Sequence, residues 1–293
     1  MNKINYSFII PHRNSPELLN RCLNSIPKRE DIEIIVVDDN SDEDKKPSVC
    51  RNDVQSIFID SEHSKGAGRA RNVGMEKAKG KWLLFADCDD FYEKDFICEL
   101  DKYIDSDYDL IIFDAFLNYD IATEKCQKNH YELYIRNYLA HPQNDRCLKQ
   151  LKHGNNATWM RMYSHDFIKK IGVKYDEVPA CNDGWFVQYA GVHARKIAAI
   201  PKKLYYYVQN QGSITTKKQP KAVILQKRRV GYKIHKLLAK HDAYCAIEPY
   251  FHGLKGYLKN YGLFFTLRLV FEKMFYDVSP LKFFYHKYIH PSS

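Results

Sequence analysis

The sequence predicts an α/β fold, in which a mainly parallel sheet is flanked by helices. The apolar, β-rich runs 6–10 and 32–37 are separated by a helical pattern that begins at Ser15. Strand, helix and strand joined by short links are typical of a parallel sheet with right-handed crossovers. Acidic residues follow the apolar runs 32–37 and 82–85. Because ligands bind outside the carboxyl ends of strands in such sheets, these acids indicate the functional edge.

Local signals place the first elements of this sheet. Ser15 followed by Pro16 is the pattern of a capping serine and a proline at the first helical position. Apolar residues then recur at helical spacing: Leu18, Leu19, Cys22, Leu23 and Ile26. A weaker strand is predicted at 56–59 and a further strand at 109–113. A capped helix is predicted from Ser164 to Lys170.

Asp38 and Asp39 follow the second predicted strand. Asn40 and Ser41 come next, so an ordinary turn would be a sufficient explanation for the acidic pair. The pair nevertheless occupies the same place relative to its strand as the later acids at 87–90. Two acidic clusters at one edge of a sheet favour a ligand site.

Residues 65–74, Lys-Gly-Ala-Gly-Arg-Ala-Arg-Asn-Val-Gly, open the next predicted helix. The stretch departs from the dinucleotide fingerprint, since its third glycine position is Arg71, and it lacks the Gly-Lys-Ser/Thr of a P-loop. A glycine loop that lets Arg71 reach an anionic or planar ligand fits better, because arginine suits both. For Arg69 we expect a surface position.

Asp87, Asp89 and Asp90 follow the apolar run 82–85. A short apolar run bounded by turn residues predicts a strand buried on both faces. Carboxylates placed together repel one another unless a cation or a donor compensates. Their oxygens suit a hard divalent ion, Mg or Mn, which would hold a phosphate-bearing substrate. A solvated acidic turn explains the cluster equally well when it is taken alone.

The composition is that of a core-forming globular chain. It has 293 residues, of which 45% are hydrophobic and 28% are charged. The first residues have no apolar signal-peptide core and no run of 18 apolar residues exists, so we expect a cytoplasmic location and no spanning helix. Eight cysteines without a CxxC pair favour reduced thiols over disulfides or a zinc site.

The last 74 residues differ from the rest in charge. Residues 220–293 carry 13 basic and 4 acidic side chains, a difference of +9 that equals the net charge of the whole chain. They also hold 15 Phe and Tyr residues, and 223–238 has an imperfect apolar stripe at helical spacing. This basic, aromatic, helical tail suits either an anionic membrane surface or packing on the preceding domain. No nucleic-acid module accompanies the charge, so we expect no nucleic-acid partner.

Four motifs occur in a fixed order: FIIPHRN (8–14), EIIVVDDNS (33–41), GAGRARNVG (66–74) and WLLFADCDD (82–90). In order and spacing they resemble the GT-A glycosyltransferases of family 2, of the type that builds bacterial surface polysaccharides. The resemblance covers residues 6 to about 215. It implies a GT-A domain over 1–219, with a donor half of about 1–115 and an acceptor half of about 116–219, followed by the tail at 220–293.

The resemblance also implies which residues bind the nucleotide-sugar donor. The positions that match are Pro11, Arg13, Asp38, Asp39, Arg71, Asp87 and Asp89. Pro11 and Asp39 would hold the base, with Arg71 near it. Asp87 would touch ribose or sugar, while Asp89, with Asp87, would bind a divalent Mn or Mg ion that bridges the diphosphate.

A second set of matching positions concerns the acceptor. NDGWF (182–186) resembles the family's acidic pair before an aromatic residue, but Asn182 stands where the usual form has Glu. Asp183 is then the carboxylate left to act as base, unless it caps a helix that begins at Gly184. Trp159, Asn182 and Trp185 would bind the acceptor, although a lone Trp is more often core. The tyrosine-rich strand 204–208 and a loop ending at Ser213 would close the domain.

The function that the resemblance implies is inverting transfer of a sugar from a nucleotide diphosphate, UDP above all, to a hydroxyl of a glycan or lipid-linked glycan. The protein would then work in the cytoplasm, either free or on the inner face of the membrane. Two other classes stay open: a nucleotidyltransferase acting on sugar phosphates, and a non-catalytic nucleotide-sugar-binding scaffold at the membrane. The sequence gives no indication of the oligomeric state.

Overall fold

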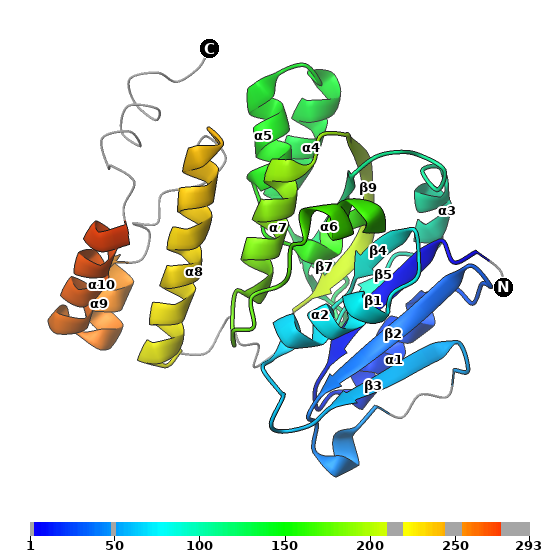
Figure 1. Cartoon of the computed structure of the whole chain (residues 1–293), viewed down its shortest axis with the longest axis horizontal. Helices are drawn as coiled ribbons and strands as arrows, with labels where there is room; N and C mark the ends of the chain where they lie inside the picture. Colours follow the sequence, from blue (N-terminus) through cyan, green and yellow to red (C-terminus); the bar gives the residue numbers. More distant parts are fainter. Residues whose placement is uncertain (1–2, 48–50, 210–218, 244–253, 277–293) are drawn as a thin grey trace.

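A computed structural model describes residues 3–47, 51–209, 219–243 and 254–276 (Figure 1). The strands are β1 (Tyr6–His12), β2 (Ile32–Asp39), β3 (Val54–Ile59), β4 (Trp82–Phe85), β5 (Phe91–Tyr92), β6 (Leu110–Asp120), β7 (Lys125–Gln127), β8 (Arg161–Ser164) and β9 (Ile197–Val208). The helices up to the end of the sheet are α1 (Pro16–Ser25), α2 (Ala67–Lys77), α3 (Phe96–Asp101), α4 (His130–Ala140), α5 (Asp145–His153), α6 (His165–Ile171) and α7 (Asn182–His193). Two short 3₁₀ turns, η1 (Glu43–Lys45) and η2 (Thr158–Met160), and three later helices, α8 (Lys221–Lys240), α9 (Leu254–Tyr261) and α10 (Leu263–Tyr276), complete the described elements.

The strands form one mixed sheet in the order β3-β2-β1-β4-β8-β6-β9-β5, with β7 paired to β6. Strands β1, β2, β3 and β4 are parallel neighbours. Strand β8 runs antiparallel between β4 and β6, β9 is parallel to β6, and β5 is antiparallel to β9. The mainly parallel α/β sheet predicted from the sequence is confirmed.

This order brings the predicted ligand residues to one edge. His12, at the end of β1, is the register partner of Asp38 in β2. Phe85, at the end of β4, is the partner of Ile9 in β1. Because the three strands are parallel, the acids that follow β2 and β4 leave the sheet on the same side.

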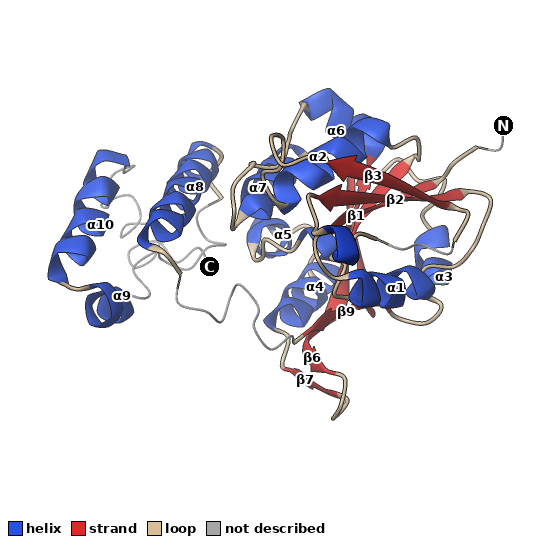
Figure 2. Cartoon of the chain, turned by 90° about the horizontal axis from the view of Figure 1, so that it is seen from below, coloured by secondary structure: helices blue, strands red, loops and turns tan. Residues whose placement is uncertain are grey.

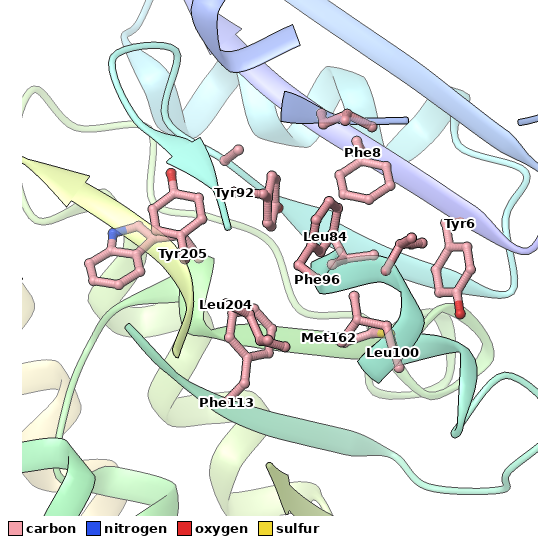
Figure 3. Packing of buried hydrophobic residues seen from close by; sticks show 14 of the residues in the cluster. Tyr6, Phe8, Leu84, Tyr92, Phe96, Leu100, Phe113, Met162, Leu204 and Tyr205 are labelled. Atoms are coloured by element: carbon pink, nitrogen blue, oxygen red, sulfur yellow. The ribbon is translucent and has the colours of Figure 1, made fainter. Parts of the chain in front are cut away.

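Helices cover both faces of the sheet (Figure 2). One apolar cluster joins the sheet to α1 and α3, and in it the Phe8 ring meets Tyr92 edge to face, with the ring centroids 5.4 Å apart (Figure 3). A second cluster packs α2, α6 and α7 on the other face, where Phe85 contacts Phe186. Burial on both faces explains why β4 is apolar at all of its positions.

Two helix-end predictions have different outcomes. Helix α6 is capped as predicted, because the Ser164 side chain accepts a hydrogen bond from the Phe167 amide, and Gly172 follows the helix with a φ of 62°. Helix α1 begins at Pro16 as predicted, but Ser15 makes no side-chain capping bond. Its hydroxyl instead donates to the Arg13 carbonyl oxygen, 3.1 Å away.

The tail is helical where it is described, as predicted. Helix α8 packs against α7, and α9 and α10 pack against α8 around Ile224, Phe265 and Leu269 (Figure 1). No helix in the described ranges combines the length and apolarity needed to cross a membrane. The predicted loop at Ser213 lies outside the described residues.

The cysteines that the structure describes are all free thiols: Cys22, Cys88, Cys98, Cys126, Cys147 and Cys181. The other two, Cys50 and Cys245, lie outside the described residues. The described cysteines therefore form no disulfide with one another.

Candidate active site

Asp38 and Asp39 occupy the end of β2 but face different partners. Asp38 is buried, and its Oδ1 lies 2.7 Å from His12 Nδ1 while its Oδ2 accepts the Ser41 amide at 3.0 Å. Asp39 accepts the Gly66 amide at 2.8 Å and thereby fixes the start of the glycine loop. Asp38 therefore shapes the turn after β2, and Asp39 joins that turn to α2.

Pro11 and Arg13 lie on either side of the end of β1. Pro11 is buried in the sheet as the register partner of Val37. The Arg13 side chain is 56% exposed, and its guanidinium lies 3.8 Å from Asp39. An anionic ligand could displace the exposed Arg13 guanidinium from the buried Asp39 carboxylate and then bind it.

The three acids after β4 separate into two groups. Asp90 is buried, accepts the Tyr205 hydroxyl at 2.9 Å and accepts the Val208 amide at 2.8 Å. Burial raises the pKa of Asp90 well above its ordinary value, and the charges of Asp87 and Asp89 add to this. Asp90 thus ties the loop after β4 to β9, whereas Asp87 and Asp89 keep exposed surface.

The described residues include no group of three or more His, Cys, Asp or Glu side chains arranged to hold a metal ion. Asp87 and Asp89 nevertheless have the right chemistry for Mg or Mn, which bind through one or two carboxylates and substrate phosphates rather than through an all-protein cage. The residues present therefore fit an ion bound together with a diphosphate.

Arg71 connects the β4 acids to helix α7. Its guanidinium is buried, pairs with Asp87 and donates to Asn182 Oδ1 at 2.7 Å. The ring centroid of Tyr175 lies 5.4 Å from it, and its Nε has no hydrogen-bond partner. The sequence placed Arg71 near the nucleotide base; the structure places it between the two acidic motifs.

Asp183 lies in the first turn of α7, which begins at Asn182. The N-cap residue is Cys181, so the alternative in which Asp183 caps a helix starting at Gly184 is wrong. Desolvation raises the pKa of Asp183; the charge of Asp87 also raises it, while Arg71 opposes the shift. A carboxylate with a raised pKa is a better proton acceptor than an ordinary one.

The two tryptophans predicted to bind the acceptor are largely covered. Trp159 is 8% exposed, and its ring stacks on Tyr205 and Tyr207 at centroid distances of 5.0 and 5.3 Å. Little of the Trp159 ring is left to face an acceptor in this structure. Trp185 is half-buried, and Lys233 of α8 lies over its ring.

Sequence reasoning missed how α2 holds the segment before α7. The Asn72 side chain bonds both the amide and the carbonyl of Tyr175, at 2.9 and 3.0 Å. Glu177 pairs with Lys65 at 3.0 Å and with Arg69 at 3.4 Å, so Arg69 is half-buried and not a free surface residue. These partners are over a hundred residues apart, and no local signal marks them.

Gly68 shows why the glycine loop is needed. A Cβ at this position would lie 2.2 Å from the Asp176 carbonyl oxygen and 3.0 Å from the Asn182 Cβ. The residue is glycine because the segment before α7 approaches the backbone of α2 too closely for a side chain. Gly68 thus allows the close approach that positions Asn182 and Asp183.

A cavity of about 850 Å³ lies elsewhere, beside Ile4, Gly80 and His165. Ile4 and Gly80 precede β1 and β4, so this cavity is at the amino-terminal edge of the sheet, opposite the acids. In open α/β sheets the ligand edge is the other one.

Residues 7–172 match the protein family described as "Glycosyl transferase family 2". This match spans more than half of the 293 residues. The chain belongs to glycosyl transferase family 2. The four ordered motifs between residues 8 and 90 lie within the matched range, whereas NDGWF (182–186) lies beyond it. The expected family is confirmed.

Two relatives and one solved structure illustrate the similarity. The poly(ribitol-phosphate) beta-N-acetylglucosaminyltransferase TarS of Staphylococcus aureus (strain MW2) is 26% identical over 69% of this chain and 35% of its own length. The UDP-Glc:alpha-D-GlcNAc-diphosphoundecaprenol beta-1,3-glucosyltransferase WfaP of Escherichia coli is 25% identical over 79% of this chain and 84% of its own length. The crystal structure of S. aureus TarS 1-349 in complex with UDP-GlcNAc has a TM-score of 0.69 at 19% identity, covering 92% of this chain and 80% of that one.

These comparisons confirm the GT-A fold. The chain spans about a third of TarS, 35% of its length, so the activity of that whole protein is not transferred to this one by the match.

Proposed function

We propose that this member of family 2 transfers a sugar from a UDP-sugar to a hydroxyl of a glycan or lipid-linked glycan, with inversion. The observation that carries the proposal is the buried Arg71, which contacts both Asp87 and Asn182 and so joins the donor acids to the turn that holds Asp183. Relatives support the donor class: a solved TarS structure contains UDP-GlcNAc, and the WfaP name specifies UDP-Glc.

The chemistry is a single displacement. Asp183 accepts the proton of the acceptor hydroxyl, whose oxygen attacks the anomeric carbon from the face opposite the diphosphate. The bond from that carbon to the diphosphate oxygen breaks, and its electron pair leaves with the nucleoside diphosphate. The transition state resembles an oxocarbenium ion, and one displacement inverts the centre. The raised pKa of Asp183 favours its acceptance of the proton.

A divalent ion held by Asp87 and Asp89 would supply charge compensation for the leaving diphosphate. Arg71 contributes a permanent cation to the same place, since its guanidinium already contacts Asp87. On the nucleotide side, the resemblance assigns Asp39 and the exposed Arg13 to the donor, and the Arg13 guanidinium lies 3.8 Å from the Asp39 carboxylate. Pro11 and Asp38, which are held in place at the ends of β1 and β2, would then lie against the nucleobase.

The proposed acceptor side lies around α7. Asn182 and Trp185 flank Asp183, and Trp159 would take part only through the small surface it exposes. The WfaP name specifies a diphosphoundecaprenol acceptor, which supports a lipid-linked acceptor here.

The test is to incubate the full chain with a panel of sugar nucleotides and Mn²⁺ and to analyse the nucleotide products. We expect free nucleoside diphosphate. A nucleotidyltransferase would release no nucleoside diphosphate, and with added pyrophosphate it would form nucleoside triphosphate and a sugar phosphate. A scaffold would bind the sugar nucleotide without turnover. The nucleotidyl reaction is disfavoured because the segment 11–14, at the end of β1, has no glycine.

A second feature supports work at a membrane surface. Helices α9 and α10 expose Leu258, Leu263, Phe264 and Leu267, and Phe264 is 89% exposed. Basic residues are interleaved with them at Lys259 and Arg268. Apolar side chains beside cations suit an anionic bilayer, where each basic residue contributes about 1 kcal/mol. We infer peripheral binding to the inner leaflet, next to a lipid-linked acceptor.

This inference is tested by sedimentation with phosphatidylglycerol vesicles. The full chain should sediment at low salt and be partly released at high salt, because the attraction is screened. The double variant Phe264→Ser, Leu267→Ser should stay in solution. Leu133→Ser with Leu139→Ser, which alters two exposed apolar residues of α4, should behave like the unchanged chain. If sedimentation does not depend on lipid charge, the inference is wrong and α9 and α10 serve to pack on α8.

A further inference from the structure

Helix α8 contacts the turn of α7 that carries Asp183. Val230, Ile234 and Leu238 of α8 form a buried cluster against Trp185 and Val192 of α7. Figure 1 shows α7 between the sheet and α8, so the first helix of the basic tail lies next to the helix that carries the proposed base. A helix that served only as a membrane attachment would not need this position.

Two neighbouring residues of α8 contact the two residues that follow Asp183. Ile234 is buried, and its Cδ1 lies 3.0 Å from the place that a Cβ on Gly184 would occupy. The Lys233 Nζ lies 3.7 Å from the ring centroid of Trp185, two residues after the base. These contacts leave no space between α8 and the first turn of α7.

Lys233 also reaches the segment before α7. Its Nζ donates to Asp176 Oδ1 at 2.7 Å, and the Asp176 amide donates to the Asn182 carbonyl oxygen at 3.3 Å. One ammonium group therefore joins the loop that precedes Asp183 to the ring that follows it. An ammonium over an aromatic face is attracted by the ring, and the carboxylate adds a charge-assisted hydrogen bond.

We propose that Lys233 and Ile234 are positioning residues that set the orientation of the first turn of α7 and hence of the Asp183 carboxylate. The inference rests on the proposed role of Asp183 as the base. Helix α8 then belongs to the catalytic unit, although the sequence divided the chain just before it. Proton transfer needs a well-placed acceptor, and a displacement of about 1 Å can cost up to about 10²-fold in rate.

The test compares three variants of the full chain. Lys233→Met keeps the length of the side chain but loses its charge, Lys233→Arg restores a cation that can bond Asp176 and stack on Trp185, and Lys236→Met is the control on an exposed position of α8. We expect Lys233→Met to lower kcat several-fold while the KM for the donor and the affinity for UDP stay unchanged. Lys233→Arg should recover most of kcat, and Lys236→Met should match the unchanged chain.

The proposal is overturned if Lys233→Met and Lys236→Met have the same kcat. It is also overturned if Lys233→Met lowers kcat, UDP affinity and Tm together and arginine rescues none of them, because that pattern is a general loss of stability. Ile234→Val, which removes one methyl group from the contact with Gly184, gives an independent check with little risk to folding.

Hydrogen exchange at the amides of 182–186 measures the positioning without using the reaction. Faster exchange in Lys233→Met than in Lys236→Met is expected, and equal exchange contradicts the positioning role. If Asp183→Asn retains turnover while the exchange rates differ as expected, the assignment of the base has failed and the contact of α8 with α7 has not.

Discussion

The two sides of the site are held in different ways. On the nucleotide side, Asp38 contacts His12 of the neighbouring strand β1, and Asp39 contacts Gly66, the N-cap residue of α2. On the side of the catalytic base Asp183, Asn182 is held by Arg71, and the loop before Asn182 is held by α2 and α8. The ends of β1 and β2 are thus supported from within the donor half, whereas the catalytic base, like the loop after β4 that Asp90 ties to β9, depends on distant parts of the chain.

Because of this difference, we expect that donor binding and the rate of sugar transfer can be altered separately. Changes at the ends of β2 and β4 should act on donor binding. Changes in α2 or α8 that move the start of α7 should act on the rate of transfer. Each of the following predictions would weaken or sharpen that division.

The largest effect on binding is expected from Asp89→Ala. Loss of a metal-binding carboxylate should weaken Mn²⁺-dependent UDP-sugar binding by more than the about 10–100-fold that loss of an outer-shell partner causes. Calorimetry with and without Mn²⁺ measures this directly. If the variant binds the donor with Mn²⁺ as tightly as the unchanged chain, the metal assignment is wrong.

A smaller effect is expected from Gly68→Ala. The added Cβ would collide with the Asp176 carbonyl oxygen at 2.2 Å, and overpacking of this kind costs about 1–3 kcal/mol of stability. Because Asn182 lies on the same side, transfer should fall by a larger factor than UDP affinity.

Gly80→Ala is the matched control for that prediction. Its Cβ would lie 2.6 Å from Ser7 Oγ, at the opposite edge of the sheet, so it creates a similar collision away from the site. Tm should fall in both variants, but only Gly68→Ala should lose transfer beyond what its stability explains. Equal losses would mean that α2 does not position α7.

The smallest effect is a shift in the pH dependence of transfer. Asp183 must be ionised to accept a proton, so kcat should fall as the pH drops through its pKa. Desolvation and the charge of Asp87 raise that pKa, so the acidic limb of the kcat profile should lie above the usual range of a carboxylate. The profile is measured at saturating donor; an acidic limb in the ordinary carboxylate range would contradict the raised pKa.

The same contrast explains what the sequence could predict. The strands, the α1 and α6 helices and the acids after β2 and β4 have local signals, and the structure contains them. The structural role of Asp90 has no such signal, because its partners Tyr205 and Val208 lie over a hundred residues further on. The covering of Trp185 by Lys233 also has no local signal, because the two residues lie on different helices.

Asn182 shows how a departure from a motif acquires a meaning only in three dimensions. From the sequence, asparagine in place of the usual Glu only raised doubt about that position. In the structure its amide oxygen accepts from Arg71, whose charge is already matched by Asp87. Because Asn182 is neutral, Asp183 is the carboxylate of that motif. No sequence pattern could reveal that Arg71 lies between Asn182 and Asp87.

The central claim is that Asp183 is the base and that donor binding is built separately from it. Asp183→Asn tests both parts in one protein, since the amide is nearly isosteric with the carboxylate but accepts no proton. We predict that UDP-sugar affinity with Mn²⁺ is retained, while single-turnover transfer falls by about 10²–10⁴-fold. Near-normal transfer by the variant, or loss of donor binding together with transfer, would contradict the account.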